Sequence, residues 1–273
     1  MRHVPRCLKL LLLGLLLTGI DVGQTPADLG AKTELAKQAL LAHRYSEAVT
    51  VYKQLIEAVP NEPGLRFNLA LALYSSGQYR EAVRELDLIR TAEQRNVKFW
   101  FLLGVGYLKL DQWDKAVDPL RRAAELEPLN VDIRRELARA LWANRRFEDA
   151  IPILEGLLDK APEHADWQFE LGDAYLAAGQ IARGIGHLER AVELAPRFLP
   201  AQAKLGEALL HAGNPASAIP HLELAESMDT DGSLHFQLAT AYRRVGNKEL
   251  AAHALARYQE LQHAAPSISP QSM

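Results

Sequence analysis

A 34-residue register runs through almost the whole chain and restricts the folds that it can form. Counting from Leu29 gives repeat starts at Leu29, Pro63, Val97, Val131, Ala165 and Leu199, and a seventh falls one residue early, near Gly232. A leucine recurs at the same place in every copy: Leu35, Leu69, Leu103, Leu137, Leu171, Leu205 and Leu238. The register therefore predicts seven equivalent units, near residues 29–62, 63–96, 97–130, 131–164, 165–198, 199–231 and 232–263.

Within each copy, the apolar and small residues follow the period of a helix. In the third copy they stand at i, i+3, i+4 and i+7: Trp100, Leu103, Gly104 and Tyr107. A matching stripe follows in a second helix: Ala116, Leu120, Ala123 and Ala124. Glycine and alanine in facing stripes allow two helices to approach closely, so each copy is predicted to be a helical hairpin.

Glycine and proline mark the helix ends. Glycines stand where the end of a first helix needs a left-handed residue: Gly77, Gly179, Gly213 and Gly246. Prolines close four copies: Pro60, Pro128, Pro162 and Pro196. Three more prolines lie inside second helices, where each removes a backbone hydrogen bond and is expected to cause mild bending: Pro119, Pro152 and Pro220.

The spacing Trp-x2-Leu-Gly-x2-Tyr, then Ala-x3-Leu and a closing proline resembles the tetratricopeptide repeat. The resemblance implies an all-α fold, a right-handed α-solenoid of about seven stacked helix-turn-helix repeats over residues 29–263. In that family the first helices line a concave groove that binds extended peptides or helices. The resemblance therefore implies a non-enzymatic scaffold for protein–protein interactions that needs no cofactor.

The family's groove positions can be transferred to this chain one residue at a time. They are apolar in the second and third copies and both charged and aromatic in the fourth and fifth: Phe67, Leu71, Tyr74, Phe101, Val105, Leu108, Arg135, Arg139, Trp142, Phe169, Asp173 and Leu176. We expect a protein or peptide partner whose apolar side chains dock near Phe67 and Phe101, and whose acidic group meets Arg135 and Arg139.

An alternative interpretation assigns the same residues a structural role. The aromatic side chains then pack against the next repeat. Arg135 and Arg139 pair with Glu170 and Asp173 across the repeat interface, as solvated ion pairs of small energy. The sequence leaves both interpretations open.

The first residues differ in kind from the repeats. Basic residues precede an apolar run from Leu10 to Ile20, and the chain turns polar at Asp21. Such a run spans only about half of a bilayer core, so residues 1–24 are predicted to be a signal peptide that exports the chain to the periplasm or the medium. The alternative is an uncleaved anchor in the inner membrane. Residues 264–273, rich in proline and serine, are predicted to be a disordered tail.

The net charge and the spacing of short motifs disfavour nucleic-acid binding and metal binding. A formal charge of −3 over 273 residues gives no basic excess for nucleic acid. His187 and His221 occupy equivalent places on adjacent second helices, but spacing supplies no third ligand, which disfavours a histidine-based metal site. The run from Asp229 to Gly232 echoes a calcium loop and is better explained as helix capping.

The sequence thus predicts a scaffold that supports an envelope or secretion assembly. A membrane-anchored adaptor is the alternative, and self-association stays open.

Overall fold

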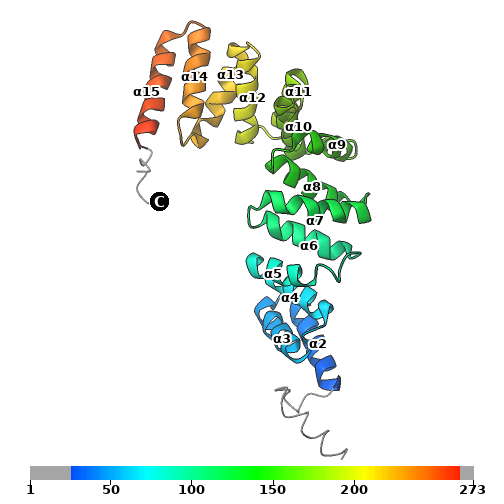
Figure 1. The fold of residues 1–273 in the computed structure, drawn as a ribbon. Coiled ribbons are helices and arrows are strands. Elements are labelled where there is room, and N and C mark those ends of the chain that lie inside the picture. Colours follow the sequence, from blue (N-terminus) through cyan, green and yellow to red (C-terminus); the bar gives the residue numbers. More distant parts are fainter. Residues whose placement is uncertain (1–25, 265–273) are drawn as a thin grey trace, which may run out of the picture. The chain divides into compact units, whose positions relative to one another are not determined.

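The structure, a computed structural model, describes residues 26–264. Over this range it contains helices and no strand, which confirms the expected all-α helical-repeat fold (Figure 1). The predicted signal or anchor segment at residues 1–24 lies outside the described residues. So does the predicted tail, apart from Ala264, which ends the last helix.

The helices follow one another in two alternating sets. The first helices of the repeats are α2 (Pro26–Leu41), α4 (Pro63–Ser75), α6 (Val97–Leu108), α8 (Val131–Ala143), α10 (Ala165–Ala177), α12 (Leu199–His211) and α14 (Ser233–Arg244). The second helices are α3 (Tyr45–Ala58), α5 (Tyr79–Ile89), α7 (Trp113–Leu126), α9 (Phe147–Leu158), α11 (Ile181–Leu194), α13 (Pro215–Ala225) and α15 (Lys248–Ala264), and a 3-10 turn η1 (Glu226–Met228) follows α13. Five first helices begin at the residues where the 34-residue count starts a repeat.

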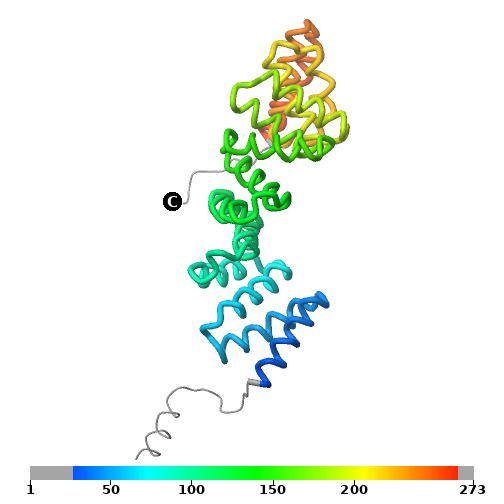
Figure 2. The backbone as a smooth tube through the Cα atoms, turned by 90° about the vertical axis from the view of Figure 1, so that its right-hand side faces the viewer, coloured from blue at the N-terminus to red at the C-terminus, as the bar shows by residue number. Residues whose placement is uncertain are grey.

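The chain divides into two compact units, Met1–Gln112 and Trp113–Met273, and the boundary falls between α6 and α7. Within each unit, successive helices pack side by side (Figures 1 and 2). In the second unit each first helix also contacts the first helix of the next repeat, α8 with α10, α10 with α12, and α12 with α14. These four helices therefore form one continuous face, which we call the first-helix face.

The recurring leucines form the core between repeats. Six of the seven are buried: Leu69, Leu103, Leu137, Leu171, Leu205 and Leu238. Burial of a leucine side chain stabilises a fold by about 1.5–3 kcal/mol. Leu35 on α2 is instead 45% exposed, because in the described part of the chain no earlier repeat packs on that helix.

The turn between the two helices is the same in all seven repeats. The predicted left-handed conformation is confirmed at four glycines, Gly77, Gly179, Gly213 and Gly246 (φ 75 to 87°). The other three repeats use His43, Asp111 and Arg145 (φ 55 to 58°). In each repeat the next backbone N–H donates to a carbonyl five residues earlier, as Gln180 does to Tyr175 at 2.8 Å, which satisfies a free carbonyl at the helix end.

Side chains also join the end of one repeat to the start of the next. The fourth residue of a first helix donates to a carbonyl six residues earlier, in the loop that follows the preceding second helix. This contact recurs as Arg66 to Pro60 (3.5 Å), Trp100 to Gln94 (3.0 Å), Gln168 to Pro162 (2.9 Å) and Gln202 to Pro196 (2.8 Å). Different residue types thus satisfy the equivalent loop carbonyl in four repeats.

A tyrosine hydroxyl makes a second recurring contact between repeats. In the third, fifth and seventh repeats it donates to a carboxylate on the preceding second helix: Tyr107 to Asp87, Tyr175 to Glu155 and Tyr242 to Glu223. Burial, and after it the Glu155 carboxylate, raises the pKa of Tyr175 to about 12, so the hydroxyl keeps its proton. The predicted bending at Pro119, Pro152 and Pro220 stays a prediction, although α7, α9 and α13 continue through these residues.

Candidate functional site

Half of the predicted groove residues lie together on the first-helix face of the second unit. Arg135, Arg139 and Trp142 lie on α8, and Phe169, Asp173 and Leu176 lie on α10. Every one of these six side chains lines one or more of three cavities along this face. We call them the Arg145, Asp229 and Glu170 cavities, after one lining residue each.

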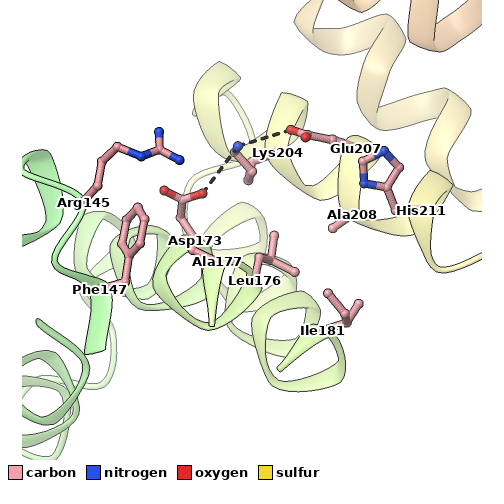
Figure 3. A pocket seen from close by; sticks show the side chains of 10 residues that line it. All are labelled: Arg145, Phe147, Asp173, Leu176, Ala177, Ile181, Lys204, Glu207, Ala208 and His211. Carbon is pink, nitrogen blue, oxygen red and sulfur yellow. Dashed lines mark ion pairs between the residues drawn. The ribbon is translucent and has the colours of Figure 1, made fainter. Parts of the chain in front are cut away.

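The Arg145 cavity has a volume of about 280 Å³ (Figure 3). Its lining is Arg145, Phe147, Asp173, Leu176, Ala177, Ile181, Lys204, Glu207, Ala208 and His211. Lys204 Nζ lies 3.4 Å from Asp173 Oδ1 and 3.2 Å from Glu207 Oε2. Burial alone would lower the pKa of Lys204, but the Asp173 and Glu207 carboxylates outweigh burial and raise it. Lys204 therefore stays charged and joins α10 to α12 at one edge of the cavity.

An aromatic row crosses the same face. The Phe169 ring lies 5.9 Å from Trp142 and 5.1 Å from Phe198, measured between ring centroids, in edge-to-face geometry. Trp142 Nε1 donates to Asp173 Oδ2 at 2.9 Å. The rings thus pack against neighbouring repeats, as the alternative interpretation expects, and each of them also lines a cavity.

The Glu170 cavity, of about 330 Å³, contains both predicted arginines. Its lining is Arg135, Glu136, Arg139, Trp142, His164, Asp166, Trp167, Phe169, Glu170 and Phe198. The arginines pair along their own helix: Arg135 with Asp132 (3.2 Å) and Glu136 (3.2 Å), and Arg139 with Glu136 (3.6 Å). The predicted pairing of Arg135 and Arg139 with Glu170 and Asp173 across the interface is therefore replaced, because nearer carboxylates compete for the guanidinium groups.

Glu170 has an unusual environment on this face. Burial raises the pKa of its carboxyl to about 7, and the nearby Asp166 and Glu136 carboxylates raise it as well, against a lowering by Arg139. A carboxyl with this pKa changes from protonated to ionised near neutral pH. The charge of the Glu170 cavity therefore changes with pH in the physiological range.

The Asp229 cavity, of about 490 Å³, includes residues that sequence reasoning did not assign to the groove. Its lining is Trp142, Phe169, Asp173, Pro200, Ala203, Lys204, Glu207, Met228, Asp229, Thr230, Asp231, Ser233, Leu234 and Gln237. The loop before α14 supplies one wall. Asp229 Oδ2 accepts the His235 backbone N–H at 2.9 Å, and Asp231 Oδ1 accepts the Ser233 backbone N–H at 2.9 Å, so the capping interpretation is confirmed.

The remaining predicted groove residues lie in the first unit. Phe67, Leu71 and Tyr74 lie on α4, and Phe101, Val105 and Leu108 lie on α6. The first five are half-buried, and Leu108 is only 5% exposed. Leu108 therefore offers almost no surface to a partner, whereas the other five keep part of their apolar side chains accessible.

The two histidines singled out by the sequence make matching contacts inside their own repeats. His187 Nδ1 lies 2.8 Å from Gln168 Oε1, and His221 Nδ1 lies 2.6 Å from Gln202 Oε1. Each glutamine oxygen accepts, so Nδ1 carries the proton, and burial lowers the pKa of both rings. Over residues 26–264, no three His, Cys, Asp or Glu side chains come together in a way that could hold a metal ion.

Comparison with protein-family models identifies the repeat. Models described as tetratricopeptide repeat match residues 39–104 and, in overlapping copies, residues 101–165, 135–197 and 169–233. The chain belongs to the tetratricopeptide repeat family. In the same described range, residues 26–264, no helix combines the length and apolarity of a membrane span.

Curated relatives share only part of their length with this chain. Anaphase-promoting complex subunit 3 of Dictyostelium discoideum is 30% identical over 95 residues, which is 35% of this chain and 10% of the relative. The peptidyl-prolyl cis-trans isomerase FKBP42 of Arabidopsis thaliana is 37% identical over 86 residues, 32% of this chain and 23% of the relative. The chain thus spans less than a quarter of either relative.

Solved structures of tetratricopeptide repeat proteins show the same fold. YrrB, described as having an unusual peptide-binding site, gives a TM-score of 0.58 at 20% identity, over 67% of this chain and 90% of YrrB. PilW, a type IV pilus biogenesis factor, gives 0.58 at 19% identity, over 72% and 92%. MamA from Desulfovibrio magneticus gives 0.55 at 24% identity, over 62% and 98%. At these identities the likeness extends to the fold alone.

Proposed function

We propose that this tetratricopeptide repeat protein is a non-enzymatic scaffold that binds a segment of a protein partner along the first-helix face of its second unit. The observation that carries the proposal is the continuity of the three cavities. The Arg145 and Asp229 cavities share Asp173, Lys204 and Glu207, and the Asp229 and Glu170 cavities share Trp142 and Phe169. A row of connected depressions suits an extended peptide or a helix better than one small molecule.

The charge of the face indicates the chemistry of the partner segment. The cavities are lined by seven acidic side chains, Glu136, Asp166, Glu170, Asp173, Glu207, Asp229 and Asp231. They are lined by four basic ones, Arg135, Arg139, Arg145 and Lys204, which leaves a formal charge of −3. We therefore propose a partner segment with apolar and basic side chains. It takes the place of the acidic segment expected from Arg135 and Arg139, whose charges are neutralised on α8.

The proposal is tested by selecting short displayed peptides on the full chain and measuring their affinity for two variants. Phe169→Arg places a charged, longer side chain in the aromatic row and is expected to weaken binding by about tenfold or more. Glu193→Arg, an exposed position on α11, is the matched control and should bind as the wild type does. Equal binding by both variants, with unchanged helicity, would place the site elsewhere.

We also propose that residues 1–24 export the chain and that it supports an envelope or secretion assembly from the periplasm or outside the cell. The support is the basic start followed by the apolar run from Leu10 to Ile20, and the similarity in fold to a pilus biogenesis factor. Sequencing the N-terminus of the protein from its native source separates the alternatives. A start near Thr25 supports export by a cleaved signal, whereas retention of Met1 or Arg2 favours the anchored adaptor.

A further inference from the structure

We infer that the Asp229 cavity is the receptor for a basic side chain, an arginine above all, of the bound partner segment. This inference rests on the proposed function, because it names one residue type that the segment presents. The cavity lies where the loop before α14 faces α12 and the aromatic row. Two buried acceptor atoms of its lining residues have no hydrogen-bond donor among the described residues.

The first of these atoms belongs to Asp229. Its side chain is fully buried, with 0% of its surface exposed. Oδ2 accepts hydrogen bonds from the backbone N–H and from the ring Nδ1 of His235. Oδ1 is also buried, and no hydrogen-bond partner reaches it from any described residue. A buried acceptor without a donor costs about 1–3 kcal/mol, so the folded protein maintains an unfavourable arrangement at this atom.

The second atom is Gln237 Oε1, on the first helix that follows the loop. It too is buried and finds no hydrogen-bond partner among the described residues. Gln237 and Asp229 line the same cavity. Two residues of one cavity thus carry buried acceptors without donors, and a ligand that donates hydrogen bonds would satisfy them once the side chains that cover these atoms shift.

The charged side chains that line the cavity favour a positively charged hydrogen-bond donor. Four carboxylates line it, Asp173, Glu207, Asp229 and Asp231, against one ammonium group, Lys204. Lys204 is already held between Asp173 and Glu207. The Ser233 backbone N–H lowers the pKa of Asp231, so this carboxyl at the cavity rim stays ionised. The net charge of −3 therefore favours a cation over a neutral amide or hydroxyl group.

The shape and the aromatic wall favour a guanidinium group. Trp142 and Phe169 line the cavity together with Asp229 and Gln237, the residues that carry the two acceptors. A guanidinium carries five donors in a planar fork and stacks on aromatic rings, whereas an ammonium is a compact, strongly hydrated charge. A divalent metal ion fits less well, because residues 26–264 contain no group of three or more side chains suited to hold one.

The test follows the indole N–H signal of Trp142 by NMR while a short peptide is added to the full chain. The probes are acetyl-Ala-Arg-Ala-amide and the same peptide with citrulline, which keeps the shape of arginine and loses its charge. We expect a saturable shift of the Trp142 signal with the arginine peptide and at least about a fivefold weaker effect with citrulline. Equal shifts with both peptides, or none with arginine, would overturn the inference.

A substitution at Gln237 tests whether its buried oxygen binds the peptide, apart from any effect on folding. Gln237→Met keeps the length of the side chain and removes the buried oxygen. It should weaken binding of the arginine peptide at least about fivefold and raise the melting temperature, because an unsatisfied acceptor is lost. Gln38→Met, at an exposed position on α2, is the matched control and should change neither. Asp229→Asn, which retains an oxygen to cap α14, is expected to lose binding as well. Wild-type affinity in both cavity variants would contradict the inference.

The inference and the proposed function fail in different experiments. Suppose that selected peptides need the first-helix face but bind equally well without a basic residue. The inference is then wrong and the scaffold proposal stands. Suppose instead that peptides ignore the Phe169→Arg variant while the arginine probe still shifts Trp142 over citrulline. The cavity is then a receptor for arginine, and the proposed binding along the whole face is wrong.

Discussion

At the scale of single residues, the turn inside each repeat depends on one left-handed position. Gly179 occupies it in the fifth repeat with φ of 75°, and an added Cβ there would meet no atom within 4 Å. Gly186, inside α11, has equally open space around it and no positive φ. Alanine substitutions at these two glycines therefore distinguish the effect of a left-handed backbone from the effect of side-chain packing.

Gly179→Ala should lower the free energy of unfolding by about 1 kcal/mol, because a side chain disfavours the left-handed region. Gly186→Ala should raise it by up to about 1 kcal/mol, because alanine is the better helix former. Urea denaturation measures both changes. Equal effects of the two substitutions would show that the left-handed turn is not the cause.

The carboxyl of Glu170 provides a prediction for pH. Its pKa of about 7 in the folded protein lies above the ordinary value, so the folded state holds this proton more tightly than the unfolded state. The associated stability is present below about pH 4.5 and is lost as the pH rises through about 7. From pH 5 to pH 8 the free energy of unfolding should fall by up to about 3 kcal/mol on this account.

Glu170→Gln should remove that part of the pH dependence, as measured by urea denaturation at several pH values. Glu193→Gln, exposed on α11, serves as the control and should keep the wild-type slope. A slope that is unchanged in Glu170→Gln would assign the effect to other groups.

At the scale of elements, the packing of α10 on α11 depends on facing glycines. A Cβ on Gly172 of α10 would lie 3.0 Å from the backbone oxygen of Gly184 on α11 and 2.8 Å from Leu188 Cγ. Backbone atoms cannot move aside as the end of a flexible side chain can. The fifth repeat therefore favours glycine at this place, where four other first helices carry alanine, at Ala36, Ala70, Ala138 and Ala239.

Gly172→Ala is expected to destabilise the protein by about 1–3 kcal/mol, despite the better helix propensity of alanine, because α10 and α11 must separate. Gly186→Ala on the same helix pair is the control, and thermal unfolding followed by circular dichroism measures both. A stabilised Gly172→Ala variant would mean that the helices can shift apart without loss.

At the scale of the whole chain, a repeat's position decides what its core residues contribute. Leu35 and Leu205 hold equivalent places, yet Leu205 is fully buried and Leu35 is 45% exposed at the start of the described residues. Leu205→Ala should cost about 2–5 kcal/mol, as large-to-small changes in a core do. Leu35→Ala should cost less than half as much in the same urea titration. Equal costs would show that another surface covers Leu35.

Much of the architecture was predictable, because one register repeats the same local physics seven times. The starts of α4, α6, α8, α10 and α12 coincide with the counted repeat starts, and the left-handed glycines have the predicted conformation. The helical period also placed Trp142, Phe169 and Asp173 on one face. Residues at equivalent places in adjacent repeats face the same way, so the sequence alone could bring them together.

Tertiary structure decided the partners of the charges and the position of the receptor cavity. Arg135 pairs with Asp132, and Arg139 pairs with Glu136. Lys204 pairs with Asp173. Ion pairing depends on which carboxylate is nearest in space, and the sequence does not show this. The Asp229 cavity brings a loop outside the helical period against α12 and the aromatic row. Periodicity determines which face a helical residue occupies, whereas unmet acceptors and pocket volumes arise only when side chains from separate repeats pack together.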